Sequence, residues 1–239
     1  MKKIIRKIIF GHKADSNTYV KYLKSIGVRV GKDVDIYSPF FTTIDVTRPW
    51  LIEIGDNVKI TKNVTILTHG YDWSVLKVKK SEILGSSGKV TIGNNVFIGM
   101  KTTILKGVTI GNNVIIGANS LVNKNIPDNV VVAGNPAKVI TTIDEYYKKR
   151  KQTQLSEAVQ CACEYYKVYK KWPEKKIMRE FIWLFEDRSI DVDTDAVFSE
   201  IGSLCLNYKS TKENFYKTKG EFKNYNEFIE YCKEELNKK

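Results

Sequence analysis

The chain has 239 residues, of which 42% are hydrophobic and 11% aromatic, and its formal net charge at pH 7 is +12. This composition is that of a folded soluble protein with one good core and room for a smaller second unit. No apolar run is long enough to span a bilayer, and the basic opening lacks the uninterrupted apolar core and cleavage site of a signal peptide. We therefore expect a cytoplasmic protein.

The positive charge is concentrated in the first part of the chain. From Asp144 onward there are 19 basic and 18 acidic residues, which leaves 20 basic and 9 acidic residues in positions 1–143. An anionic ligand or surface is expected there, such as a phosphate-rich cofactor, an acidic glycan or a membrane. Nucleic acid is not expected as a partner, because the sequence contains no helix-turn-helix, RRM or zinc-finger pattern.

Residues 2–26 are predicted to form a helix with an apolar face and a basic face. The preferred interpretation is a helical cap, residues 1–27, over the open end of the fold that follows. A cationic amphipathic helix also suits an anionic membrane, so peripheral membrane contact is the alternative interpretation. The two faces consist of Ile4, Ile5, Ile8 and Ile9 on one side and Lys2, Lys3, Arg6 and Lys7 on the other.

A repeat of six residues follows and decides the architecture. Its period fits neither an amphipathic helix nor simple strand alternation, and predicts a coil of three short flat faces with about 18 residues per turn. The aliphatic first residue of each unit should point inward, and the Gly or Asn beside it should take the positive φ of a sharp corner. The first positions are Val30, Ile36, Ile54, Ile60, Ile66, Ile92, Ile98, Ile104, Ile110, Ile116 and Val122, and small or β-branched fifth positions include Val96, Thr102, Val108, Val114 and Ser120.

The repeat and the residues after it resemble a known family. The segment "GNNVFIGMKTTILKGVTIGNNVIIGANSLVNKNIPDNVVVAGNPAKVI", from Gly93 to Ile140, is similar throughout to the end of bacterial sugar O-acetyltransferases of the maltose and galactoside type. These are hexapeptide-repeat acyltransferases, and the resemblance extends over residues 28–142. It implies a mainly β fold, with a left-handed parallel β-helix over residues 28–143, next to the N-terminal helix and a C-terminal α-helical domain over residues 144–239.

The repeat is interrupted after His69, one of two histidines in the chain. Ile54 and Ile92 are 38 residues apart, which six does not divide, so a segment is inserted between them. Residues 72–89 contain no hexads and include a Gly-Ser-Ser-Gly stretch, which predicts a loop beside the histidine that can cover a substrate. The other histidine, His12, lies outside the repeat and is expected to be structural.

The resemblance implies acetyl-CoA-dependent chemistry at this loop. Family members carry their catalytic histidine at the corner ahead of such a loop, so His69 is the expected general base for direct attack by a sugar hydroxyl. The resemblance places the oxyanion donor at the main-chain N–H of Met100. A surface histidine and solvated lysines are the alternatives without a functional role. The positions that the resemblance assigns to acetyl-CoA are Met100, Ala118, Asn123, Lys124 and Lys138.

The acceptor is expected to bind around "IDVTRPW" and beside the histidine. Sugars stack on aromatic rings and hydrogen-bond to charged groups. On that basis, the acceptor site is assigned to Asp45, Arg48, Trp50, Tyr71, Asp72 and Trp73. Asp72 is also a candidate for orienting the imidazole, and ordinary packing is the alternative for both tryptophans. Pro49 stands where the family pattern has an acidic residue, which argues against simple maltose or galactoside specificity.

From Asp144 onward the pattern becomes helical. We predict a first helix with an apolar face, a second with Pro173 in its first turn, a third around residues 196–206 and a fourth near residues 225–236. The apolar face of the first helix consists of Leu155, Val159, Ala162, Cys163, Tyr166 and Tyr169. The cysteines are Cys161, Cys163, Cys205 and Cys232; their spacing fits neither a metal site nor a disulfide framework, so buried thiols are expected. The extension should bind a longer glycan acceptor or steady an oligomer.

The preferred function is O-acetylation of a sugar or glycan precursor, as in capsule or lipopolysaccharide synthesis, by a homotrimer with sites between neighbouring subunits. N-acetylation of an amino sugar is the alternative on the same coil, although the nucleotide-binding domain of many such relatives is missing. A non-catalytic β-helix scaffold or glycan-binding module is the other class, and it would not need His69, the loop or the "AGNPAKVI" ending. No metal is expected, because the carbonic anhydrases of this fold use three histidines and the chain has two.

Overall fold

The computed structural model describes residues 8–204 and 206–238, and the chain divides into two compact units. The first unit ends at Tyr146 and the second begins at Tyr147. Each unit has a hydrophobic core of its own. Within the described ranges, no helix has the length and apolar character needed to cross a membrane.

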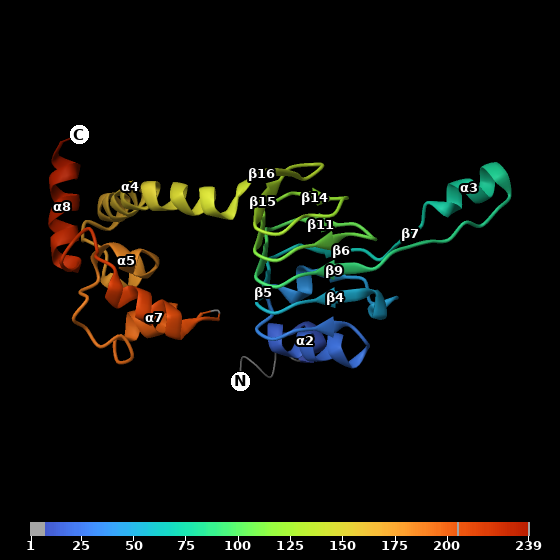
Figure 1. The fold of residues 1–239 in the computed structure, drawn as a ribbon, viewed down its shortest axis with the longest axis horizontal. Coiled ribbons are helices and arrows are strands. Elements are labelled where there is room, and N and C mark those ends of the chain that lie inside the picture. Colours follow the sequence, from blue (N-terminus) through green and yellow to red (C-terminus); the bar gives the residue numbers. More distant parts are fainter. Residues whose placement is uncertain (1–7, 205, 239) are drawn as a thin grey trace. The chain divides into compact units, whose positions relative to one another are not determined.

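The first unit is a coil with three sheet faces, which the chain visits in turn (Figure 1). All neighbouring strands within the three faces are parallel except the last one. The first face contains β1 (Arg29–Val30), β4 (Ile52–Ile54), β9 (Val90–Ile92) and β12 (Thr109–Ile110). The second contains β2 (Asp35–Ile36), β5 (Val58–Ile60), β10 (Val96–Ile98), β13 (Val114–Ile116), β15 (Val130–Ala133) and the antiparallel β16 (Lys138–Thr142). The third contains β3 (Thr43–Ile44), β6 (Thr65–Ile66), β11 (Thr103–Ile104) and β14 (Leu121–Val122).

The pairing register confirms the predicted turn of the coil where the repeat is uninterrupted. Val96 pairs with Val114 and Ile98 with Ile116, in each case 18 positions further along the chain. The first residues of the hexads point inward as predicted, and Ile98, Ile104 and Ile116 are fully buried. Each such isoleucine stabilises the fold by about 1.5–3 kcal/mol through the surface it removes from water. The predicted fifth positions are buried as well: Val96, Thr102, Val108, Val114 and Ser120.

The glycines in second position serve a purpose other than the predicted one. A Cβ on Gly93 would lie 2.6 Å from the carbonyl oxygen of Gly111 in the next coil, so glycine is needed for close approach and not for a positive φ. The positive φ falls two residues later, on asparagines such as Asn95 and Asn113, both at 55°. Their side chains form a ladder, in which Asn57 donates to Asn95 at 2.9 Å and Asn95 donates to Asn113 at 2.8 Å.

The first coil is longer than the others. Val30 pairs with Ile54, 24 positions further on, and not with a residue 18 positions away. The additional residues form two short 3-10 turns at corners of the coil, η2 (Pro39–Phe41) and η3 (Pro49–Leu51). In both turns the proline is buried and the residue after it is exposed, so each insertion pushes an aromatic side chain outward.

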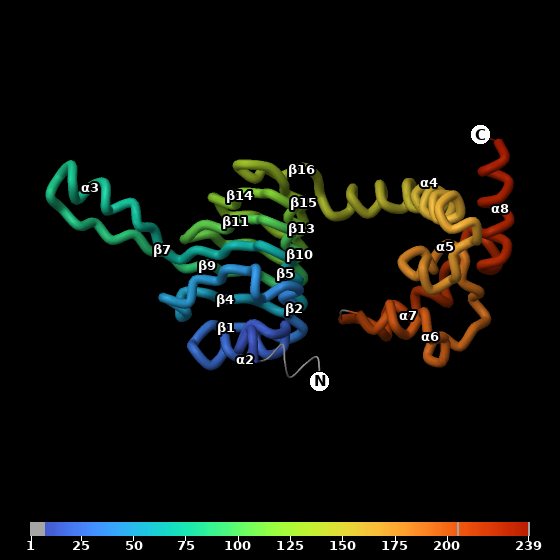
Figure 2. The backbone as a smooth tube through the Cα atoms, turned by 180° about the vertical axis from the view of Figure 1, so that it is seen from behind, coloured from blue at the N-terminus to red at the C-terminus, as the bar shows by residue number. Residues whose placement is uncertain are grey.

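The predicted loop is a projection, residues 69–87, which we call the arm. Val58 pairs with Val96, 38 positions further on, so the usual 18 residues are extended by 20. The prediction of an irregular loop is wrong in part, because β7 (His69–Gly70) pairs with β8 (Ser86–Ser87) and the arm also carries helix α3 (Trp73–Lys80). Seen from either side, the arm extends away from the coil (Figures 1 and 2), and no residue of α3 is buried.

The predicted helix over residues 2–26 is not continuous. A 3-10 turn, η1 (Gly11–Lys13), precedes helix α2 (Ser16–Ser25), whose first turn is capped by the Asp15 carboxylate accepting from the Thr18 N–H at 2.9 Å. Tyr19 and Leu23 are buried in the core of the coil, so α2 covers its open end. Residues lying outside the described ranges are Lys2, Lys3, Ile4, Ile5, Arg6 and Lys7, and the exposed Ile8 and Ile9 are described.

The second unit is helical, as predicted, with differences in its elements. The first and fourth predicted helices are α4 (Ile143–Tyr169), which begins in the first unit, and α8 (Tyr225–Asn237). The second is a 3-10 helix, η4 (Lys175–Phe181), followed by the single turn α5 (Ile182–Phe185); the third is α6 (Ala196–Gly202). Helix α7 (Tyr208–Lys217) was not predicted, because the lysines and polar residues along it hide its one buried aromatic residue, Phe215.

Two expectations for side chains of the second unit are also wrong. Tyr169 is exposed at the end of α4, although the inner residues of the predicted apolar face, Ala162 and Cys163, are buried. Cys161 is exposed, whereas Cys163 and Cys232 are buried free thiols as expected. The side chain of Cys205 lies outside the described residues.

Replacing Gly93 by Ala is expected to destabilise the first unit by about 1–3 kcal/mol, because the new methyl group would overlap the main chain of the next coil. Gly85→Ala is the matched control: a Cβ there meets nothing within 4 Å, and the change should stay within about 0.5 kcal/mol. Equilibrium urea unfolding measures both, with hydrogen exchange assigning the transition to the coil. Equal stability of the two variants would contradict the close-approach argument.

Candidate active site

His69 stands where the arm leaves the coil. It lies three residues after the end of the third-face strand β6, at Ile66, and is the first residue of β7. Its side chain is 31% exposed, and its Nδ1 lies 2.6 Å from Oδ2 of Asp45. The imidazole is therefore held on one side by a carboxylate and keeps access to solvent on the other.

Asp45 is buried, with 4% of its side chain exposed, and its carboxylate is surrounded by donors. Oδ1 accepts from the N–H and the hydroxyl of Thr47, at 3.0 and 2.6 Å. Oδ2 accepts from the N–H of Thr68 at 3.1 Å, from the Thr68 hydroxyl and from His69. Burial alone would raise the pKa of Asp45, but the hydrogen bonds from Thr47, Thr68 and His69 outweigh it and hold the pKa well below its ordinary value.

This geometry fixes which imidazole nitrogen is left for chemistry. An ionised carboxylate can only accept, so the Nδ1 of a neutral His69 must carry the hydrogen that points at Asp45. The lone pair then lies on Nε2, the nitrogen on the far side of the ring. A histidine in this tautomer can take a proton from a hydroxyl group, and the buried carboxylate stabilises the imidazolium that results.

The carboxylate that holds the imidazole is not the one that the sequence offered for this role. The sequence assigned Asp45 and Asp72 to the acceptor site and gave Asp72 as a candidate for orienting the imidazole; the carboxylate bonded to His69 is that of Asp45, and the described residues include no such bond from Asp72. The missed signal is the length of the first coil. Ile44 pairs with Ile66, so β3 and β6 end side by side. Asp45 is the first residue after β3, and Thr68 and His69 follow shortly after β6, so the three residues leave the sheet at the same corner.

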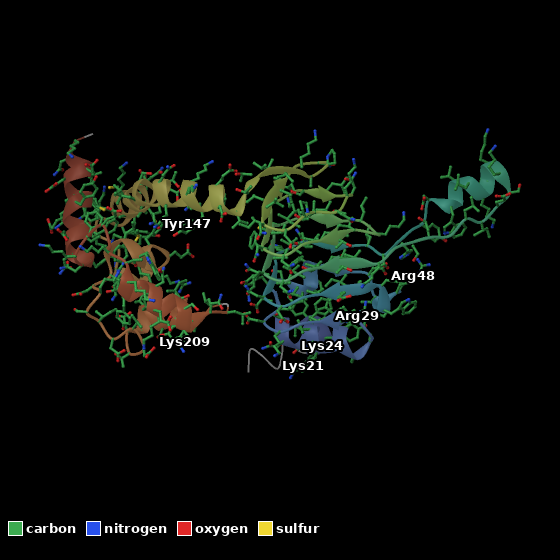
Figure 3. All side chains as sticks on the ribbon, in the orientation of Figure 1. Lys21, Lys24, Arg29, Arg48, Tyr147 and Lys209 are labelled. Atoms are coloured by element: carbon green, nitrogen blue, oxygen red, sulfur yellow. The ribbon has the colours of Figure 1, made fainter. Side chains whose placement is uncertain are left out.

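The base of the arm is braced by polar contacts. Arg48, which the sequence assigned to the acceptor, donates from Nη1 to the Ser87 hydroxyl at 3.1 Å, and Figure 3 shows it where the arm leaves the coil. The Gly88 N–H donates to the carbonyl of Thr68 at 2.9 Å. The first bond ties β8 to the coil, and the second joins the segments that enter and leave the arm next to His69.

The aromatic residues assigned to the acceptor lie near this base. Trp50 is 60% exposed and Tyr71 is 70% exposed, so neither is ordinary core packing. The rings of Tyr71 and Trp73 lie against each other with centroids 4.8 Å apart. Of the residues predicted for the acceptor side, Arg48 is thus bonded to the arm and Tyr71 packs against Trp73.

Met100 lies at a different corner of the coil. We call the turn between the third and first faces, residues 45–51, 67–89, 105–108 and 123–125, the His69 corner. The turn between the second and third faces, residues 37–42, 61–64, 99–102 and 117–120, is the Met100 corner. The side chain of Met100 is exposed, and among the described residues its main-chain N–H has no hydrogen-bond partner. One chain alone therefore does not bring this N–H to His69.

The residues assigned to acetyl-CoA are also divided between the corners. Ala118 lies one coil beyond Met100 at the Met100 corner, whereas Asn123 and Lys124 follow β14 at the His69 corner. Lys138 is the first residue of β16, on the second face. The side chains of all five residues are exposed, so they are available to a ligand. In the part of the chain that the structure describes, no group of acidic residues, cysteines and histidines is arranged to hold a metal ion.

The repeat is shared with known proteins. Residues 89–124 match the family model described as bacterial transferase hexapeptide (six repeats). The chain is 42% identical to Protein CapG of Staphylococcus aureus over 149 residues, which are 62% of this chain and 83% of that protein. It is 35% identical to the putative acetyltransferase YvoF of Bacillus subtilis over 132 residues, 55% of this chain and 70% of that protein.

Two further similarities concern enzymes named for sugars. The chain is 40% identical to the galactoside O-acetyltransferase of Escherichia coli over 132 residues, 53% of this chain and 64% of that enzyme. A solved structure of a maltose O-acetyltransferase from Clostridium difficile is 27% identical, with a TM-score of 0.40 over 59% of this chain and 83% of that one.

Replacing Asp45 by Asn is expected to lower the free energy of unfolding at pH 7 by about 1–3 kcal/mol. The side-chain NH₂ of the asparagine can then face a hydrogen-bond donor, the N–H of Thr68, in place of the carboxylate oxygen. The folded-state pKa of Asp45 lies below its unfolded value. The stability that the carboxylate confers is therefore present above about pH 4 and lost as the pH falls further. Urea unfolding between neutral and acid pH measures this difference.

The matched control is Asp72→Asn, which changes an exposed carboxylate at the same corner and should alter the free energy of unfolding at pH 7 by no more than about 0.5 kcal/mol. A wild-type advantage over Asp45→Asn that stayed constant down to the lowest pH would contradict the depressed pKa.

Proposed function

The chain belongs to the hexapeptide-repeat acetyltransferase family and is an acyltransferase, and we propose that it transfers an acetyl group from acetyl-CoA to a hydroxyl group of a sugar or glycan precursor. The similarity to a galactoside O-acetyltransferase supports a sugar acceptor and O-acetylation. The left-handed sense of the coil is part of this proposal, because it comes from the family and not from the strand order. An enzyme is favoured over a scaffold by the family assignment.

The observation that carries the proposal is the bond between His69 and Asp45 at an exposed corner. It leaves Nε2 of the imidazole free to accept a proton.

The acceptor hydroxyl would give its proton to Nε2 of His69 as its oxygen attacks the carbonyl carbon of the thioester. The C–S bond then breaks, and the departing sulfur takes the proton back from the imidazolium. An ester and a free thiol result, and the histidine returns to its starting state without a covalent intermediate on the protein.

The oxyanion formed in this attack needs a donor, which we assign to the main-chain N–H of Met100. Since Met100 and His69 occupy different corners, the two groups would act together where the Met100 corner of one subunit faces the His69 corner of the next. A closed ring of three subunits repeats that contact without leaving an unpaired corner. The homotrimer is thus a consequence of dividing the site between corners.

The arm supports a subunit contact at this place. Its apolar side chains are left in water by the single chain: Val75 is 69% exposed, Val78 is 88% exposed and Ile83 is 63% exposed. The arm begins at His69 and projects away from its own coil (Figure 1). A neighbouring subunit would supply the surface that covers it. Covering these residues would also close the site against water.

Binding of the two substrates follows from the same arrangement. Trp50 and the paired rings of Tyr71 and Trp73 offer apolar faces for a sugar at the base of the arm. Lys124 and Lys138 are exposed and can neutralise phosphate groups of acetyl-CoA. Lysine contacts phosphate as a single charge and lacks the fork of arginine, so these contacts confer charge more than geometry.

Removing the imidazole is expected to abolish most of the activity. His69→Ala should lower kcat by about 10²–10⁴-fold, the usual contribution of a general base, while acetyl-CoA binding is retained. His12→Ala is the matched control, because His12 stacks on Tyr22 with ring centroids 3.8 Å apart, outside both corners. Thiol release from acetyl-CoA over a panel of sugars measures both, and unchanged activity of His69→Ala would overturn the proposal.

A mixing experiment tests whether the site is divided between subunits. His69→Ala and Ala118→Trp, which blocks the Met100 corner, should each be inactive as homotrimers. Unfolded and refolded together in equal amounts, they should recover about a quarter of the wild-type activity, because that share of contacts then joins two intact corners. No recovery, with mixed trimers confirmed by mass spectrometry, would place the whole site within one chain.

A further inference from the structure

Lys106 lies at the base of the arm, next to the residue that follows His69. Ile66 pairs with Ile104, so Lys106 leaves the third face one coil beyond the histidine. An ideal Cβ on Gly70 would lie 3.5 Å from the Lys106 Nζ. The lysine is half-buried, and its ammonium group has no hydrogen bond or ion pair among the described residues. Its charge is therefore held beside His69 and is available to a ligand.

Arg48 supplies a second cation from the coil before the histidine. Ile44 pairs with Ile66, so Arg48 leaves its coil at the same corner, where the arm begins (Figure 3). Its Nη1 donates to the Ser87 hydroxyl at 3.1 Å, and Ser87 pairs with His69 across the arm. No ion pair of Arg48 occurs in the described ranges, and a guanidinium group has more N–H donors than this one bond uses. The remaining donors can bind a ligand.

Acidic side chains balance these two cations only in part. The Asp72 carboxylate also lies against Gly70. The Asp45 carboxylate is buried and already accepts from two threonines and from His69. The His69 corner has seven basic side chains, Arg48, Lys77, Lys79, Lys80, Lys89, Lys106 and Lys124, and three acidic ones, Asp45, Asp72 and Glu82. The corner is thus positively charged around the place where the acceptor would bind.

The Met100 corner, which would face this place from the neighbouring subunit, adds to the positive charge. Its segments contain Lys62 and Lys101, and no aspartate or glutamate occurs in their sequence. The Nζ of Lys62 lies 4.3 Å from the centre of the Phe41 ring, so this ammonium group is held by a ring and not neutralised by a carboxylate there. A site formed between the two corners would therefore be basic on both sides.

Acetyl-CoA accounts for only some of these cations. Its phosphates are separated from the thioester by the long pantetheine arm, and the thioester has to lie at His69 during the reaction. Lys106 and Arg48 are close to His69, so they would face the uncharged, reacting end of the donor. Lys124 follows β14, one coil further from His69 than Lys106, and remains the lysine proposed for a phosphate. The two cations beside His69 are thus left for the acceptor.

Building on the function proposed above, we propose that the acceptor is an anionic sugar and that Lys106 and Arg48 bind its carboxylate or phosphate group. The guanidinium offers paired N–H donors to either group, and the ammonium adds a single charge. The exposed rings of Trp50 and of the Tyr71–Trp73 pair would contact the apolar face of the same sugar. Lys106 and Arg48 would position the acceptor and take no proton from it.

Binding of sugars to the full-length His69→Ala protein, measured by calorimetry, tests this proposal without turnover. The probes are galactose and glucose, each beside its uronic acid and its 6-phosphate, so that the carboxylate and the phosphate are tested separately. One anionic form should bind about tenfold more tightly than its neutral sugar, as expected for charge-assisted hydrogen bonds. Added salt should reduce this preference. Equal affinity within every set, or no binding by any anionic form, would overturn the proposal.

Substitutions in the same His69→Ala background identify the side chain. Lys106→Gln should remove most of the preference and leave binding of the neutral sugar unchanged. Lys89→Gln is the matched control, because this lysine of the same corner is already paired with Glu53 at 2.6 Å; it should keep the preference. If Lys106→Gln instead weakens acetyl-CoA binding and leaves the anionic sugar bound, Lys106 serves the donor and the proposal is wrong.

Thiol release by the wild type with the same sugars is measured separately. Anionic sugars that bind in preference but are not acetylated would contradict the proposed function and leave the charge preference standing. Acetylation of neutral and anionic sugars with equal kcat/KM would support the proposed function and overturn the preference.

Discussion

In the repeat units whose second residue is glycine, such as those with Gly55, Gly93 and Gly111, neighbouring coils lie so close that a single methyl group would not fit between them. This approach ties every coil to the next in one register, with a column of isoleucines on the inside and a ladder of asparagine side chains at a corner. Insertions are accepted only where they leave that register intact. Both turns of the first coil and the arm meet this condition, since each starts and ends at a corner.

The rigid register gives the site its accuracy. Asp45 and His69 come from coils of unequal length, yet their side chains meet at 2.6 Å because the strands before them are paired. The carboxylate is fixed by Thr47 and Thr68 before it meets the imidazole. His69 is thereby held by the coil, while Gly70 and the residues after it extend into the arm. The imidazole is placed accurately, and the chain opens toward substrate directly after it.

Much of this could be predicted from the hexads. Counting hexads predicts the period of the coil, the residues that point inward and the insertion after His69, because each unit obeys the same geometry. It also assigns His69 to one corner of the coil. The pairing of Asp45 with His69 did not follow, since the first coil breaks the count with two insertions. The glycines were misread because sequence alone does not distinguish a residue chosen for its φ from one chosen for its lack of a Cβ. Helix α7 was missed because its single buried residue gives no period.

The final strand of the coil runs against all the others in its face. β16 pairs with β15 in the antiparallel sense, with a shift in register between Val131 and Val132. A stack of parallel coils has no natural length, and its last edge is a template on which a further coil, from the same chain or another, could form. Reversing the direction presents a mismatched edge there, and α2 covers the opposite end. The same repeat that would suit an endless fibre is in this way confined to a particle of defined length.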